Sequence, residues 1–421
     1  MGYRVYAGTI TKPDGVTDGF QWVEKNCIFD SAGDSIEGHE YAAFLEDPVW
    51  TQEKNQFGSF ECTIPYQVMT PFSTFTNPIY GTIAISQTWI EVDEDGTPAW
   101  LGYVTELELQ FDKSYRLYAE GVLGKLQSYS HYIYAGYHVL TDPGSSRGDS
   151  IFGLCTYEEN MPCGTFTVGE VTVQRGKGVD TTDKGAILDT DWNILNSLLL
   201  EEYDGYLRAR LVVNSGIYHV YVDYLVDIEE TTDQTIEYGV NLLDFTYSLK
   251  MTSDFVTRII AYGTNTTTEG WWIFKKTSIT AINASYIDEE AEAKYGRVEK
   301  MIAVDGNSTY ESLEQAAKEE LATYSQTLEP TMSLRAFDRK DAGENVQRLG
   351  YLKRTHIISE PHGIDNWLVC TKASIALAEP DNKRYEFGLP PEKLTRQQNT
   401  NSVRQQSISL NMRGVLSSNN G

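Results

Sequence analysis

The stretch that decides the fold begins with Asn241-Leu242-Leu243-Asp244-Phe245 and continues with Asp254-Phe255-Val256-Thr257-Arg258-Ile259-Ile260-Ala261-Tyr262-Gly263. After a polar excursion, the chain returns at Lys294-Tyr295-Gly296-Arg297-Val298-Glu299-Lys300. Apolar residues on both sides of the 255–261 run are typical of a strand that is covered on both faces. The return over residues 295–304 is the expected partner of that strand. Because no residue in this stretch is typical of an active site, we expect it to build a scaffold.

A helix is predicted directly after the return. Ser308-Thr309-Tyr310-Glu311 fits a capping box, in which a hydroxyl and a carboxylate three residues later satisfy the first amide groups of a helix. The apolar residues that follow recur at helical spacing: Leu313, Ala316, Ala317, Leu321 and Tyr324. The pattern predicts a helix over 309–325, with residues 264–293 forming an insertion between two strands.

The first third of the chain is predicted to be β structure, followed by a short helix over 122–129. The turn Asp93-Glu94-Asp95-Gly96 joins a strand at 89–92 to a longer strand at 100–111, which is typical of a hairpin. The longer strand is expected to have one apolar face, because its odd-numbered positions carry these apolar residues: Leu101, Tyr103, Leu107, Leu109 and Phe111. We therefore expect this strand to be half-buried.

A small α+β region is predicted in the middle of the chain. Asp191 is a good N-cap, apolar residues follow at helical spacing, and Gly205 lies just past the expected end, so a helix is predicted over 191–204. The turn Asn214-Ser215-Gly216 then closes a predicted hairpin over 206–225. Strands are expected to resume at 331–337, 353–358, 367–377 and 384–387.

These patterns predict a mainly β protein with α+β parts, divided into four segments. Residues 1–135 form a first β domain, residues 136–240 an α+β domain, and residues 241–393 a second β domain. Residues 394–421 are rich in Gln, Asn and Ser and are expected to form a flexible or partner-ordered tail. With 421 residues, the chain is too long for one ordinary core.

Two hairpins of similar type support the idea of two related β domains. Residues 100–121 and 367–388 align without a gap and share Trp, Leu, Tyr and Gly residues. The alignment places their apolar faces on opposite sides, however, and a shift of one residue inverts a strand. The identities are therefore attributed to chance, while the repeated kind of element remains evidence for similar domains.

Composition and cysteine usage restrict the class of protein. The formal net charge is −26, which argues against a nucleic-acid-binding surface and against docking on an anionic membrane. The five cysteines are scattered and odd in number, so we expect no disulfide framework and folding in a reducing cytoplasm. No segment has the pattern of a signal peptide or of a membrane span.

The candidate chemical motifs all have a simpler interpretation. None of the six histidines (His39, His131, His138, His219, His356 and His362) forms a His-Glu-x-x-His motif. Cys155 and Cys163 are too far apart for a zinc knuckle. Acidic pairs such as Glu106/Glu108 and Glu201/Glu202 resemble a glycosidase dyad but are common in so acidic a chain. The Arg147-Gly148-Asp149 tripeptide is short enough to occur by chance. We therefore predict no catalytic, cofactor-binding or metal-binding residue.

Several loose motifs, taken in order, resemble the hub proteins of phage tails. They are Leu45-Glu46-Asp47-Pro48-Val49-Trp50, the run 55–65, Trp100-Leu101-Gly102-Tyr103-Val104, the run 119–126, the central stretch 241–300 and Tyr385-Glu386-Phe387-Gly388. Members of this family are called baseplate or tail-tip hub proteins, tail-associated lysins or prophage tail endopeptidases. The resemblance covers roughly residues 40–390.

The resemblance implies two β-barrel-like hub domains in each subunit and a ring-shaped homotrimer at the virion tail tip, assembled in the host cytoplasm. The implied partners are the distal tail protein ring, the tape-measure protein and tail fibre or receptor-binding proteins, with phage DNA passing through and no insertion into a membrane. Many relatives carry C-terminal lytic modules, and this sequence stops after a polar tail. We therefore expect a structural hub and no enzyme.

Two other functions remain open from the sequence. One is a tail-associated peptidoglycan hydrolase or endopeptidase, as the names of some relatives imply. The other is a receptor-binding or carbohydrate-binding tail protein, for which the aromatic residues would provide stacking surfaces, although aromatic residues are equally typical of subunit interfaces.

Overall fold

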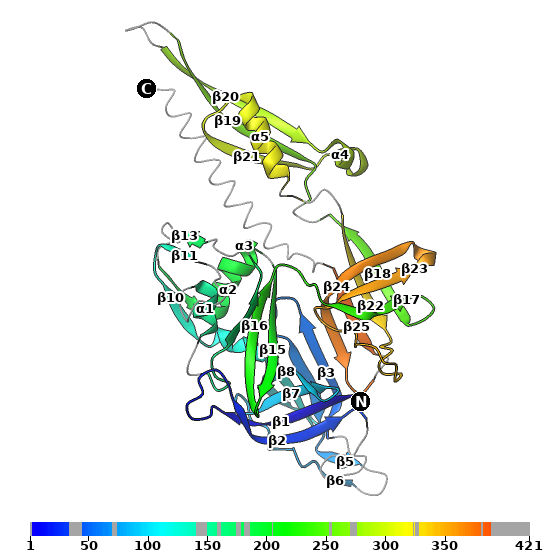
Figure 1. Ribbon diagram of the computed structural model, residues 1–421. Helices are drawn as coiled ribbons and strands as arrows, with labels where there is room; N and C mark the ends of the chain where they lie inside the picture. The colour runs from blue at the N-terminus through cyan, green and yellow to red at the C-terminus, as the bar shows by residue number, and fades with distance from the viewer. Residues whose placement is uncertain are drawn as a thin grey trace. The chain divides into compact units, whose positions relative to one another are not determined.

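The computed structural model describes residues 2–32, 44–69, 74–139, 150–157, 161–173, 178–180, 186–203, 205–251, 255–269, 276–322, 324, 328–379 and 382–388. The chain divides into two compact units. Unit 1 comprises Met1–Thr246 and Ser333–Phe387, and unit 2 comprises Tyr247–Met332 and Gly388–Gly421. The predicted fold class, mainly β with helical parts, is confirmed (Figure 1). The predicted tail at 394–421 lies outside the described residues.

A large sheet dominates unit 1, and its strands follow the order β18-β22-β25-β24-β3-β4-β9-β8-β7-β1-β2, with β23 pairing β24 and β17 pairing β23. The strands are β1 (Tyr3–Thr11), β2 (Gln21–Asp30), β3 (Glu46–Glu53), β4 (Ser59–Ile64), β7 (Trp89–Glu94), β8 (Thr97–Leu109), β9 (Tyr115–Gly121), β17 (Thr231–Glu237), β18 (Leu242–Lys250), β22 (Glu329–Ala336), β23 (Arg354–Ser359), β24 (Ile364–Ala376) and β25 (Lys383–Phe387). The predicted strands at 331–337, 353–358, 367–377 and 384–387 correspond to β22–β25.

The sheet is joined across a long distance in sequence by the antiparallel pairing of β24 with β3. Ile375 lies opposite Trp50, and the hydroxyl of Thr51 donates to the hydroxyl oxygen of Ser374 over 3.1 Å. Strands from the end of the described chain thus complete a sheet that the first strands begin. The predicted segment 241–393 consequently does not fall within one unit, because residues 333–387 lie in unit 1 and residues 247–332 in unit 2.

The large sheet is open over the residues that the structure describes. Its strand order runs from β18 to β2, and no pairing between these two ends is found in the described residues. The described residues of this sheet therefore do not form a closed barrel, although barrel-like domains were expected.

Strand β8 separates two hydrophobic cores of unit 1. Leu101 and Tyr103 lie in the first core, and Trp100 and Val104 lie in the second. Both faces of this part of the strand are buried, so the prediction of a half-buried strand is wrong here. Apolar and polar residues do alternate in β8, but the Glu residues that suggested a solvent-exposed face occur only in the second half of the strand.

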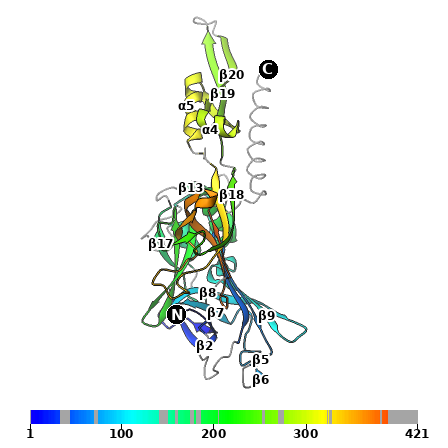
Figure 2. The same ribbon diagram turned by 90° about the vertical axis from the view of Figure 1, so that its right-hand side faces the viewer.

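A β-bulge between Val104 and Glu106 changes the facing of the second half of β8. The extra residue moves Leu107 to the side of the second core, away from Leu101 and Tyr103 with which its spacing had grouped it. Beyond it, Leu109 and Phe111 are exposed as the β8–β9 hairpin extends to its turn (Figure 2). A single inserted residue therefore converts a predicted core face into a surface.

The α+β middle region packs on the first core. Its helical elements are a 3-10 helix (Val122–Gln127), α1 (Ile151–Thr156), α2 (Asp191–Leu195), a π-helical turn (Asn196–Leu200) and α3 (Glu201–Tyr203). Its strands are β10 (Ser130–Ile133), β11 (Tyr137–Val139), β12 (Thr167–Val171), β13 (Gly178–Asp180), β14 (Ile187–Thr190), β15 (Tyr206–Asn214) and β16 (Ile217–Leu225). The predicted helix over 191–204 and hairpin over 206–225 are present. A further small ribbon pairs β5 (Gln67–Met69) with β6 (Thr74–Thr76).

Unit 2 is a three-stranded sheet with a helix on one face (Figure 1). Its elements are β19 (Arg258–Glu269), β20 (Lys276–Ile287), α4 (Glu289–Tyr295), β21 (Glu299–Asn307) and α5 (Tyr310–Leu321). The return over 295–304 pairs with β19 in parallel, as expected. The predicted insertion at 264–293 is largely the paired strands β19 and β20.

Both predicted helix caps are displaced by one residue. The side chain of Thr309, rather than Ser308, caps α5 and forms a reciprocal box with Ser312. Thr190, rather than Asp191, caps α2, and Asp191 is buried. Ser, Thr and Asp are all good caps, so adjacent candidates cannot be ranked by residue type alone. In the described residues, no helix is long and apolar enough to cross a membrane.

Five charged residues form a largely buried ionic cluster in unit 1: Asp95, Asp338, Asp341, Arg348 and Lys383. Asp338, Arg348 and Lys383 are buried, and Asp95 and Asp341 are partly exposed. Arg348 donates to both carboxylate oxygens of Asp95 over 3.0 and 3.1 Å and also contacts Asp341. Lys383 contacts Asp341 and lies 3.3 Å from the Tyr3 hydroxyl. The cluster joins β1, the β7–β8 turn, the 338–348 loop and β25.

The Lys383→Met variant should lose about 3–5 kcal/mol of the free energy of unfolding, because it leaves carboxylates of the cluster buried with one cation fewer. The matched control is Lys372→Met on β24, whose partner Glu53 is 40% exposed. The control should lose no more than about 1 kcal/mol. Urea unfolding measures both changes, and equal losses would contradict a structural role for the cluster.

Candidate functional site

The first candidate for a catalytic site brings together three residues that the sequence had left apart. His131 at β10 lies with Nδ1 2.5 Å from Oδ1 of Asp191, the first residue of α2. Cys155 on α1 is fully buried nearby, and burial, with the Asp191 charge adding to it, raises the pKa of its thiol well above the ordinary value. Since the thiolate is the nucleophile, Cys155 is held in its unreactive form.

The second candidate pairs Ser359 with His362 at the end of β23. The Ser359 hydroxyl lies 2.7 Å from Nδ1 of His362, which is the contact expected between a nucleophile and its base. Ser359 is 0% exposed, however, so a peptide carbonyl cannot approach it. The sequence gave no sign of this pair, because a Ser three residues before a His is not a recognisable catalytic motif. The contact closes the 3-10 turn Glu360–His362.

The remaining candidates are dispersed. Cys163 is buried, and burial raises the pKa of its thiol to about 12. Glu106 and Glu108 lie on the exposed part of β8, and Glu201 accepts a hydrogen bond from Asn196. His39 and the Arg147-Gly148-Asp149 tripeptide lie outside the described residues, as does the side chain of Glu202. No group of three metal-ligating side chains occurs in the part of the chain that the structure describes.

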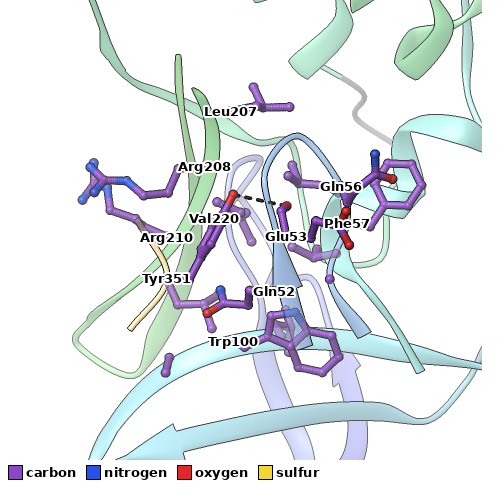
Figure 3. A pocket seen from close by; sticks show the side chains of 17 residues that line it. Gln52, Glu53, Gln56, Phe57, Trp100, Leu207, Arg208, Arg210, Val220 and Tyr351 are labelled. Atoms are coloured by element: carbon purple, nitrogen blue, oxygen red, sulfur yellow. Dashed lines mark hydrogen bonds between the residues drawn. The ribbon is translucent and has the colours of Figure 1, made fainter. Parts of the chain in front are cut away.

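A pocket in unit 1 lies between the β3–β4 turn, β8 and the β15–β16 hairpin (Figure 3). The Tyr351 hydroxyl donates to the carbonyl oxygen of Glu53 over 3.3 Å at its edge. Trp100 contributes an indole N–H that is buried and has no hydrogen-bond partner in the described structure. The lining of the pocket contains no Ser, Cys or His that could act as a nucleophile or base.

Two arginines of the pocket wall are held by one buried carboxylate. Arg208 donates to Asp223 over 2.9 Å, and Arg210 donates to it twice, over 2.5 and 2.8 Å. The backbone N–H of Glu170 donates a fourth bond over 2.8 Å. Burial favours the neutral acid, but the bonds from Arg210 and Glu170 outweigh it, so the pKa of Asp223 lies below its ordinary value. The arginines are structural here.

The Asp223→Asn variant should lose about 2–3 kcal/mol of stability at pH 7, the range for hydrogen bonds to a charged group. A depressed folded-state pKa stabilises the protein above the unfolded value of about 3.9, and this contribution is lost as the pH falls through the folded pKa. The difference in stability between wild type and variant should therefore shrink progressively as the pH falls below about 4. Thermal melts across pH measure this, with the exposed Asp227→Asn as control; a difference that stays constant on acidification would contradict it.

The exposed aromatic side chains are better candidates for a site of interaction than these buried groups. Trp367 on β24 is 51% exposed, and its ring stacks on that of His356 on β23, with centroids 4.7 Å apart and planes at 2°. Elsewhere in unit 1, Tyr132 and Tyr134 contact each other and are 49% and 71% exposed. Large exposed aromatic residues of this kind mark surfaces of contact.

Comparison with known proteins identifies part of the chain. Residues 230–398 match the model of the family described as prophage endopeptidase tail. Over these residues the chain is similar to that family. The resemblance found in the sequence is confirmed for these residues, which include the Trp367–His356 stack and the whole of the described part of unit 2. No curated protein matches the chain.

The chain also aligns with solved structures of tail proteins over most of its length. The prophage tail protein gp18 from Listeria monocytogenes EGD-e has 12% identity and a TM-score of 0.47, with 93% of this chain and 96% of that chain covered. The 43 kDa tail protein of prophage MuSo2 from Shewanella oneidensis has 11% identity and a TM-score of 0.49, with 92% and 98% covered. A tail protein from Neisseria meningitidis MC58 has 13% identity and a TM-score of 0.43, with 92% and 96% covered.

Proposed function

We propose that this protein is a structural hub at the tip of a phage tail. It closes the tail tube as a ring-shaped homotrimer and contacts the distal tail ring, the tape-measure protein and tail fibre or receptor-binding proteins. The observation that carries the proposal is the prophage tail match over 230–398. Within the described part of this match, the surface presents a stacked aromatic pair, and the Ser359 hydroxyl of the Ser–His pair is buried.

The charge of the chain is compatible with a channel for DNA exit. A net charge of −26 repels phosphate groups, so DNA would pass through without being retained. Binding of DNA by the purified protein at low salt would contradict this part of the proposal.

The endopeptidase in the name of the matched family makes peptidoglycan cleavage the second candidate function. The geometry of the described residues argues against cleavage, because the side chains of Cys155 and Ser359 are both buried. A zymogram on purified protein distinguishes the two functions: a hub gives no clearing of cell walls. Clearing that is lost in Ser359→Ala or Cys155→Ala would establish the enzyme.

The hub proposal predicts a trimer in solution. Light scattering should give a mass of about 142 kDa, three times the 47.4 kDa of one chain, and electron micrographs should show threefold rings. Exposed aromatic residues are expected to lie in the contacts, so Tyr134→Ala should weaken the trimer without lowering the helix and strand content measured by circular dichroism. A monomer at all concentrations, or a dimer, would contradict the proposal.

A further inference from the structure

The ionic cluster of unit 1 holds an amine and a carboxyl group in direct contact. Nζ of Lys383 on β25 contacts Oδ2 of Asp341 in the 338–348 loop, and it donates to the hydroxyl oxygen of Tyr3 over 3.3 Å. The side chain of Lys383 is 1% exposed and that of Asp341 is 12% exposed. A primary amine is therefore packed against the carboxyl group of a residue 42 positions earlier in the chain.

The interior position of this pair favours a reaction that removes its charges. An ammonium group and a carboxylate are both costly to bury, and their mutual attraction offsets that cost only in part. Transfer of one proton from Nζ to Oδ2 within the contact gives an uncharged amine and a carboxylic acid. The cluster holds three carboxylates and two cations, and an excess of like charge favours protonation of one carboxylate. The uncharged amine is the form that acts as a nucleophile.

Two neighbouring side chains can assist the attack of this amine. Oδ1 of Asp341 contacts Nη1 of Arg348, and this fixed cation stabilises the negative charge that grows on Oδ1 when a nucleophile adds to Cγ. Oδ2 of Asp338 is fully buried and lies 3.8 Å from Nζ of Lys383, so it can take a proton from the nitrogen and pass it to the departing oxygen. The side-chain amide of Gln234 donates to the other oxygen of Asp338 over 2.7 Å and holds this carboxylate in place.

We propose that Lys383 and Asp341 form an isopeptide bond in the folded chain. Nζ attacks Cγ of Asp341, an N–C bond forms, the bond between Cγ and Oδ2 breaks, and Oδ2 leaves as water with two protons from the nitrogen. One ammonium group and one carboxylate thus become one neutral amide and one water molecule, so no oxidant or cofactor is needed. Holding the reactants in contact supplies the high effective concentration that amide formation requires.

The bond ties together elements that the ionic cluster already joins. β23 and β24 lie between the two linked residues, so the bond closes a covalent loop that contains both strands. A cross-link restricts the unfolded chain and thereby stabilises the fold, as a disulfide does. The cysteines of the described residues are all free, and an amide cross-link, unlike a disulfide, is not broken by reducing agents.

The test is the intact mass of the purified full-length chain, measured by electrospray mass spectrometry after unfolding and reduction. The mass should be about 18 Da, one water molecule, below the value calculated from the sequence. Digestion with trypsin and tandem mass spectrometry should give a branched peptide in which Lys383 is joined to Asp341. A wild-type chain that shows its full calculated mass would overturn the proposal, and this result depends on no variant being able to fold.

Variants assign the mass loss to the proposed bond. Lys383→Arg and Asp341→Ala should each show their full calculated mass and no branched peptide. The matched control is Lys372→Arg on β24, because Nζ of Lys372 lies 3.0 Å from Glu53 in a partly exposed pair, and it should keep the loss. Asp338→Asn should leave most of the chain unlinked, because the proton carrier is removed. A loss that persists in Lys383→Arg would overturn the proposal, and complete linkage in Asp338→Asn would overturn the role of that carboxylate.

Discussion

The buried ionic cluster is the constraint on which unit 1 depends. Arg348 and Lys383 bring two cations to three carboxylates, and Lys383 is fully buried. Such a cluster gains little over a hydrophobic packing of equal volume, but it is costly to break, because a charge would remain buried without its partner. The cluster therefore disfavours any arrangement in which β25 and the 338–348 loop do not contact the first strands. It makes the pairing of strands distant in sequence more specific than apolar contacts alone would.

The pairing of β24 with β3 and the ionic cluster both join the beginning of the chain to its later part. Both join residues about 250 to 380 positions apart, so each pays the entropy of closing a very long loop. Once one is formed, the other closes almost no additional loop. The strand pairing and the ion contacts are thus expected to be mutually supportive. The core around Leu313 and Ala317 is formed by residues of unit 2 alone.

The local elements could be predicted from the sequence because their signals are local. Asn214-Ser215-Gly216 predicted a turn, and the spacing of Leu313, Ala317 and Leu321 predicted the buried face of a helix. The bulge after Val104 could not be predicted, since one extra residue leaves no mark in an alternating pattern. Nor could the burial of Asp338 and Lys383, because their partners are distant in sequence. At the candidate sites, residue type identified the histidines and cysteines, but only packing showed that Ser359 and Cys155 are inaccessible.

The residues that match the family model and the compact units of the structure have different boundaries. Residues 230–398 contain β17, β23, β24 and β25, yet β24 pairs with β3, which lies outside the match. Arg348 and Lys383 also lie inside the match, while their contacts Asp95 and Tyr3 lie outside it. The matched region alone would expose the edge of β24 and leave both cations short of partners, and exposed edges promote association. The recognisable sequence unit is therefore not a folding unit. It needs β3 and the strands beside it, which lie outside the match, to complete its sheet.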